Sequence, residues 1–202
     1  MTLAVVVPPA VEPVSLAEMK THLRIDITDD DSLISTLITA ARDYIERVTR
    51  RTMIYTGYKL LLDTFPGWSV HLPRLPVLDQ SAGVEFLTAT PLVQYYNLQG
   101  VLTTLTAGTD YELDLYHNPP RLVLPPMVYW PWTQLGKTNA VQISFVAGYS
   151  ADASLVPPLL KNAIKLLVSH WYNNREAVGS VGDEIALAIE SICKIYSAGD
   201  YC

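Results

Sequence analysis

The sequence predicts an α+β protein in which helices from both ends of the chain form a bundle and an antiparallel β module is inserted between them. Apolar residues recur at helical spacing near both ends, whereas the middle holds short β-forming stretches separated by turn residues. We therefore divide the chain into residues 1–52 (an arm and two helices), 53–150 (the β module, a small barrel or sandwich) and 151–202 (two helices and a tail). We expect the helical parts to pack as one domain.

A short first helix is predicted over residues 16–24. Ser15 is followed three residues later by Glu18, which is the pattern of a capping box. In that motif the hydroxyl accepts from a free N–H of the first turn, and the carboxylate reaches back to the N-cap N–H.

An acidic cluster precedes a longer helix over about residues 29–50. Carboxylates at Asp29–Asp31 face the positive end of the helix dipole, so we expect them to cap the helix and to be exposed. A calcium loop is the alternative, but Leu33 and Ile34 stand where an EF-hand loop would continue. The predicted buried stripe is Leu33, Leu37, Ala41, Ile45 and Val48, with Ile34 and Ile38 beside it.

Short β-forming segments dominate residues 53–150, where glycines and prolines at close intervals mark turns. The clearest strand is Val141–Ala147, in which Val141, Ile143 and Phe145 share one face. The other predicted strands are Tyr58–Asp63, Ser69–Leu72, Val84–Thr88, Val93–Asn97, Tyr111–Asp114 and Arg121–Leu124.

A long helix begins near Pro157 and Pro158, because the first helical residues have no N–H partner to lose. A loop over residues 177–182 follows, and Asp183 is expected to cap a final helix over about 184–196. The predicted apolar stripes are Leu160, Ala163, Ile164, Leu167 and Trp171 in the long helix, and Ile185, Ile189 and Ile192 in the final one.

Composition excludes several functions. Hydrophobic residues make up 50% of the chain and charged residues only 17%, against about 25% in an average soluble protein, which favours subunit contacts or a large core. A net charge of −6 argues against a protein that grips duplex DNA. No apolar run approaches the ~20 residues of a membrane span, and we expect no export signal. Cys193 and Cys202 have no metal or redox spacing, so we expect free thiols.

We identify no catalytic, cofactor-binding or metal-binding constellation in the sequence. The histidines are scattered, there is no nucleophile elbow, and the glycines do not form a phosphate loop. The aromatic run Tyr129, Trp130 and Trp132 is more informative. It could line a ligand pocket, clamp a strand or contact a partner, and we favour partner contact or packing within the module.

Several motifs, in order, resemble the head–tail connector (adaptor) proteins of tailed bacteriophages. They are P-V-S-L-A-E-M-K-T-H-L-R-I-D at 13–26, the following acidic cluster and helix LISTLITAARDYIERVTRR, LLLDTFPG…HLPRLPV, FVAGY at 145–149, and H-W-Y-N-N-R-E-A at the end of the long helix. Residues 88–110 depart from the family pattern, being long and apolar.

The resemblance implies a structural, non-enzymatic protein of the virion neck, assembled in the host cytoplasm. It would form a ring of about twelve copies under the portal protein and above a tail-side connector or tail terminator. Double-stranded DNA would pass through without specific binding, and no membrane or cofactor would be involved. The alternative is a small-ligand-binding or enzymatic β barrel with an aromatic pocket, and a DNA-binding regulator is a third, weaker reading.

The candidate interface residues follow from this resemblance and from the aromatic content. We expect the last helix and tail, residues 193–202, to contact the portal, although Tyr196 could equally close the helical bundle. The candidate portal or subunit interface is Trp171, Tyr172, Arg175, Glu176, Tyr196 and Tyr201, and the candidate β-module contacts are Tyr129, Trp130 and Trp132.

Overall fold

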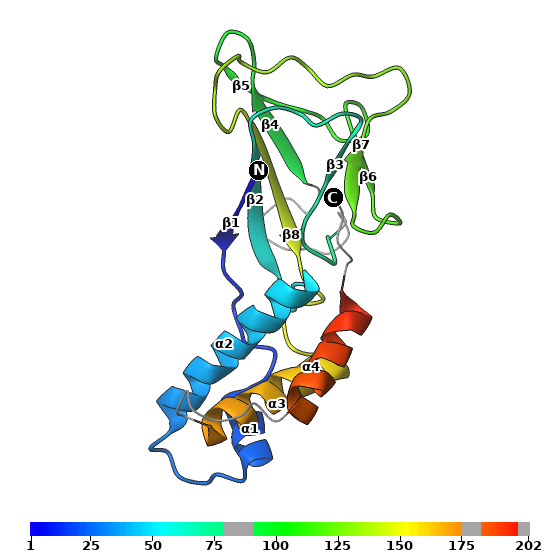
Figure 1. Ribbon diagram of the computed structural model, residues 1–202. Helices are drawn as coiled ribbons and strands as arrows, with labels where there is room; N and C mark the ends of the chain where they lie inside the picture. The colour runs from blue at the N-terminus through cyan, green and yellow to red at the C-terminus, as the bar shows by residue number, and fades with distance from the viewer. Residues whose placement is uncertain (79–90, 175–182, 198–202) are drawn as a thin grey trace. The chain divides into compact units, whose positions relative to one another are not determined.

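The computed structural model describes residues 1–78, 91–174 and 183–197 (Figure 1). Helices and antiparallel strands are both present, so the predicted α+β class is confirmed. The chain divides into two compact units, a β unit of residues 1–9 and 55–148 and a helical unit of residues 10–54 and 149–202. The predicted strand Val84–Thr88 and the loop at 177–182 lie outside the described residues.

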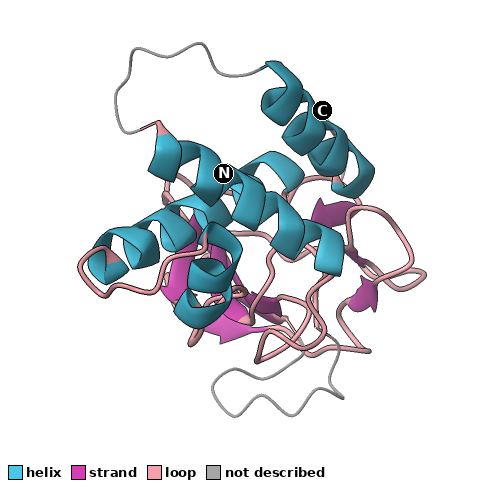
Figure 2. Cartoon of the chain, turned by 90° about the horizontal axis from the view of Figure 1, so that it is seen from below, coloured by secondary structure: helices cyan, strands magenta, loops and turns pink. Residues whose placement is uncertain are grey.

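The helical unit is built from α1 (Leu16–Leu23), α2 (Asp31–Thr49), α3 (Pro158–Asn173) and α4 (Asp183–Tyr196), which Figure 2 shows gathered around one another. The Ser15 hydroxyl accepts from the Glu18 N–H at 3.1 Å, as the capping box predicts. The Glu18 carboxylate instead accepts from Lys165 Nζ of α3 at 2.6 Å. A side chain predicted to complete a local cap therefore joins two helices that are far apart in sequence.

One apolar core holds the four helices together, and α2 and α3 contribute most of it. The buried stripe of α3 is the predicted one, with Val168 added and Trp171 only partly buried. Fully buried side chains from two distant parts of the chain meet here, so neither pair of helices has a complete core alone. The members include Val14, Met19, Ile34, Ile38, Ala41, Ile45, Leu160, Ala163, Ile164, Leu167, Val168, Ile189, Ile192 and Cys193.

The buried face of α2 is rotated relative to the prediction. Ile34 and Ile38, placed beside the stripe, are at its centre, whereas Val48 is 45% exposed. Glu46 and Thr49 are buried in its place. Glu46 tolerates burial because its carboxylate accepts from the Met53 N–H at 2.7 Å and pairs with Arg42 at 3.4 Å. A polar side chain with partners has displaced an apolar one from the inner face.

The acidic cluster does not cap α2 with its side chains as predicted. Asp30 occupies the N-cap position but makes no side-chain cap hydrogen bond. Its carboxylate accepts from the Tyr172 hydroxyl of α3, and Asp31 pairs with Lys20 of α1 at 2.7 Å. Tertiary donors from neighbouring helices have replaced the local N–H groups as partners of these carboxylates.

The β unit contains two antiparallel sheets. Their apolar faces share one core, in which Leu60 lies opposite Ile143, and Val70 opposite Leu122. The larger sheet has the order β1 (Thr2–Val7), β2 (Thr56–Leu62), β8 (Val141–Ala147), β4 (Leu92–Tyr96), β5 (Leu102–Thr104), and the smaller β3 (Ser69–His71), β7 (Arg121–Val123), β6 (Glu112–Asp114).

Two strands were not predicted. Residues 1–9, which we grouped with the helices, belong to the β unit, because β1 pairs with β2 from Thr2–Leu61 to Val7–Gly57. Consecutive valines favour an extended chain without showing the alternation by which a strand is recognised. Strand β5 forms a hairpin with β4 inside the divergent region 88–110. No helix within the described ranges combines the length and apolar character needed to cross a bilayer.

Candidate functional site

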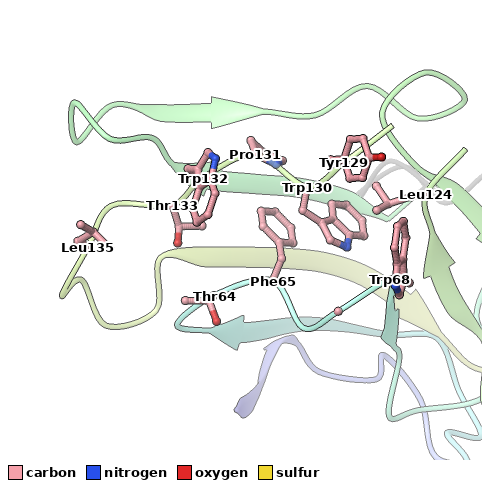
Figure 3. A pocket seen from close by; sticks show the side chains of 11 residues that line it. Thr64, Phe65, Trp68, Leu124, Tyr129, Trp130, Pro131, Trp132, Thr133 and Leu135 are labelled. Atoms are coloured by element: carbon pink, nitrogen blue, oxygen red, sulfur yellow. The ribbon is translucent and has the colours of Figure 1, made fainter. Parts of the chain in front are cut away.

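An aromatic groove lies in the β unit, between the segment that follows β2 and the long segment between β7 and β8 (Figure 3). Its volume is about 690 Å³. The side chains that line it are spread in a row from Leu135 to Trp68, so the site is an elongated groove. We call it the aromatic groove, lined by Thr64, Phe65, Gly67, Trp68, Leu124, Tyr129, Trp130, Pro131, Trp132, Thr133 and Leu135.

The floor of the groove is a ring stack. Phe65 and Trp130 lie parallel, with an interplanar angle of 1° and centroids 4.5 Å apart, and Tyr95 packs against Phe65 at 6.0 Å. The Trp130 Nε1 is buried and has no acceptor among the described residues. A buried donor without an acceptor costs about 1–3 kcal/mol.

The rim of the groove is exposed and aromatic. Trp68 and Tyr129 are each 71% exposed, with centroids 6.0 Å apart, and Trp132 is 80% exposed. The lining residues include no Asp, Glu, Lys, Arg or His. This arrangement can bind an uncharged, apolar ligand by stacking, but its lining supplies no carboxylate, imidazole or amine for acid–base catalysis.

The three described candidates of the helical unit, Trp171, Tyr172 and Tyr196, differ from this rim, because each makes a contact within the unit. The rings of Trp171 and Tyr44 pack edge to face with their centroids 6.4 Å apart, and the Tyr172 hydroxyl donates a hydrogen bond to the Asp30 carboxylate. The Tyr196 carbonyl accepts from Arg51 Nε at 2.6 Å, and the Arg51 guanidinium lies 5.8 Å from the Tyr196 ring centroid.

Tyr196 therefore packs within the helical unit, and its contact with a portal stays a prediction. The remaining candidates, Arg175, Glu176 and Tyr201, lie outside the described residues.

The sequence did not point to two of the five aromatic residues that line the groove. It indicated Tyr129, Trp130 and Trp132 but not Phe65 and Trp68, which come from a turn more than 60 residues earlier in the chain. The available signal was the F-P-G-W run, where two aromatic residues flank a Pro–Gly turn.

Two histidines that are far apart in the sequence, His71 and His117, lie close together in the β unit. The rings of His71 and His117 have centroids 5.6 Å apart. Burial lowers the pKa of His71, and the neighbouring His117 and Arg121 lower it further. Nowhere in the described part of the chain do three or more His, Cys, Asp or Glu side chains gather as a metal site would require.

Comparison with known proteins supports the resemblance seen in the sequence. Residues 13–70 match the family described as "Phage gp6-like head-tail connector protein", which confirms that resemblance over this part of the chain. No curated protein matches the chain significantly.

Solved structures share the fold over the whole chain. A chain from the neck of an empty gene transfer agent particle with C6 symmetry superposes with a TM-score of 0.79 and 22% identity, covering 100% of this chain and 98% of that one. A chain from the neck of the native particle with C12 symmetry superposes with a TM-score of 0.74 and 23% identity, and the coverage of the two chains is the same. The protein is thus similar to head–tail connectors in sequence and to neck proteins in fold.

Proposed function

We propose that the protein is a structural head–tail connector of a phage-like particle, located in the neck between capsid and tail. The observation that carries the proposal is the coincidence of two matches. The connector family matches residues 13–70, and the fold of the entire chain matches proteins taken from an assembled neck. The second match extends the resemblance over residues 71–202, the rest of the β unit and the C-terminal helices, which the family match does not reach.

The proposed assembly is a closed cyclic ring of about twelve copies. The similar structures come from necks with C6 and C12 symmetry, and a cyclic ring needs two different, complementary patches on each copy. The proposed partners are the portal protein on the capsid side and a tail-side connector or tail terminator on the other. The net charge of −6 favours passage of double-stranded DNA without retention.

The proposed role is non-enzymatic. The aromatic groove is lined by aromatic and apolar side chains together with two threonines. Its exposed rim suits contact with a protein better than capture of a small molecule, because a small-ligand site encloses most of its ligand. A β barrel that binds a small molecule in this groove remains the competing function.

Reconstituting the neck tests the proposal. The purified chain is mixed with the portal protein of the same particle, and the complexes are examined by negative-stain imaging and native mass spectrometry. We expect rings with several copies of the chain on each portal. A single bound copy per portal ring, or none at all, contradicts the proposal, and so does saturable binding of a small metabolite without any ring.

A further inference from the structure

We propose that the aromatic groove of one copy receives the proline segment, residues 5–9 (Val5-Val6-Val7-Pro8-Pro9), of a second copy, so that copies join head to tail through their β units. This inference rests on the proposed ring and names the two patches that form it. The groove contains Tyr129, Trp130 and Trp132, which the sequence singled out as candidate contacts, whereas the proline segment was not singled out.

Three features of the groove indicate what kind of ligand it can bind. Its lining has no charged side chain, so a charged ligand would lose its hydration without a compensating ion pair. Its lining residues are spread in a row, which fits an extended chain better than a compact molecule (Figure 3). Its exposed rings at Trp68, Tyr129 and Trp132 resemble the aromatic-lined grooves that bind proline-rich segments in the polyproline conformation.

The proline segment matches these features. It carries no ionisable side chain, and Val5 and Val6 are 59% and 52% exposed. Pro8 and Pro9 have no N–H, so they can be covered by a partner without leaving a donor unpaired. Their carbonyls can accept hydrogen bonds from a partner.

The segment must come from a different copy. Strand β1 is bonded along β2, and Val7 lies opposite Gly57 at the start of β2. The groove begins at Thr64, just beyond the other end of β2. The distance from Gly57 to Leu62 along a strand is roughly 17 Å, so a copy cannot fold its own proline segment into its own groove.

The same separation makes the interface heterologous. Figure 1 shows β1 at one edge of the large sheet, while the yellow-green segment between β7 and β8, which carries Tyr129 to Leu135, runs across the far end of the unit. Two different patches that lie apart on one unit can both be occupied at once. That arrangement lets each copy bind one neighbour on either side, as a ring requires.

Disulfide trapping tests the contact directly and needs no portal. Pro8→Cys and Leu135→Cys are introduced together in a Cys202→Ser background, because Cys193 is buried. We expect a ladder of disulfide-linked oligomers under mild oxidation. Adding Trp132→Ala should reduce the linked product at least tenfold, while Tyr116→Ala, which removes a fully exposed tyrosine outside the groove, should leave it unchanged.

A mixing experiment tests the head-to-tail geometry. Chains carrying only Pro8→Asp retain a groove, and chains carrying only Trp132→Ala retain a proline segment. Each alone should fail to assemble on the portal, and the equimolar mixture should give pairs that do not extend. Circular dichroism and thermal melting establish that both variants are folded, and a variant that fails this check is replaced by Val6→Asp or Trp68→Ala.

The outcomes separate this inference from the proposed function. Rings on the portal without any disulfide ladder overturn the inference and leave the connector role standing. A ladder that Trp132→Ala suppresses, without rings on any portal, supports the contact and removes the connector role. If Trp132→Ala blocks binding to a portal or tail protein but not the ladder, the groove binds that other protein and the inference is wrong.

Discussion

The two aromatic regions of this protein look alike in the sequence and differ in the structure. In the helical unit, Tyr172 donates to Asp30, and Tyr196 is held by Arg51. In the β unit, Trp68 and Trp132 are 71% and 80% exposed around a groove without charges. The same residue types therefore make contacts within the helical unit but are exposed to solvent on the β unit. Aromatic content indicates an interface only where the rest of the fold has left the rings without partners.

The difference extends to polar groups. The helical unit holds Glu46 inside its core with the Met53 N–H and Arg42 as partners, and it links α1 to α3 through Glu18 and Lys165. The β unit leaves the Trp130 Nε1 buried without an acceptor among the described residues. We infer that substitutions in the first region change stability, and that substitutions on the rim of the second change association.

The largest effect is expected at Glu46. Glu46→Ala leaves the Met53 N–H and part of the Arg42 guanidinium unpaired inside the helical unit, so the free energy of unfolding should fall by about 3 kcal/mol. Glu46→Gln keeps an acceptor for Met53 and should lose clearly less. Urea unfolding followed by circular dichroism measures both. A loss below 0.5 kcal/mol for Glu46→Ala, roughly that of an exposed position, would show that this network is dispensable.

Phe65 should have the next largest effect, confined to the β unit. Phe65→Ala removes the stack on Trp130 and part of the apolar packing around it, at about 2 kcal/mol. The matched variant is Trp132→Ala, an exposed aromatic residue of the same groove, for which we expect less than about 0.5 kcal/mol. Thermal melting compares the two. Equal destabilisation would show that the rim also serves the fold, and the contrast between the two regions would disappear.

Arg51 tests how the end of α4 is held. Its guanidinium donates to the Tyr196 carbonyl at 2.6 Å and to the Tyr149 hydroxyl at 3.1 Å. Arg51→Ala should cost about 1.5 kcal/mol and speed amide exchange in the last turns of α4. Arg47→Ala is the control, because Arg47 is exposed and pairs only with Asp43 one helical turn earlier among the described contacts. Unchanged exchange in α4 would mean that the apolar stripe alone holds this helix.

The smallest effect is a pH dependence at Glu18. The hydrogen bond from Lys165 lowers the pKa of Glu18 below its ordinary value of 4.5. Because the folded pKa is the lower one, the contribution is complete above the unfolded value and is lost as the pH falls through the folded value. The pair is partly exposed, so it is worth about 0.5 kcal/mol.

The measurement at Glu18 is a comparison between the parent protein and Glu18→Gln. The difference in their stability should be constant at neutral pH and shrink as the pH falls below 4.5. A difference that grows on acidification would contradict the assigned sign.

Local pattern was enough to predict several features. Ser15 and Glu18 predicted the start of α1, and Pro157 and Pro158 the start of α3, because a helix start depends on a few neighbouring N–H groups. Alternation along Val141–Ala147 predicted β8, since the pleat alone decides which residues share a face. The resemblance to head–tail connectors was also readable from motifs in order, and the match over residues 13–70 confirms it.

Tertiary structure decided the rest, because burial and pairing depend on residues that are distant in sequence. Glu46 lies inside the core only because the Met53 N–H reaches its carboxylate. Residues 2–7 are a strand only because β2 offers them an edge. The aromatic groove exists only where the turn at residues 64–68 meets the segment at 124–135. Local patterns were sufficient to predict the kinds of element and the family that they resemble, whereas the packing of those elements set which aromatic rings are exposed.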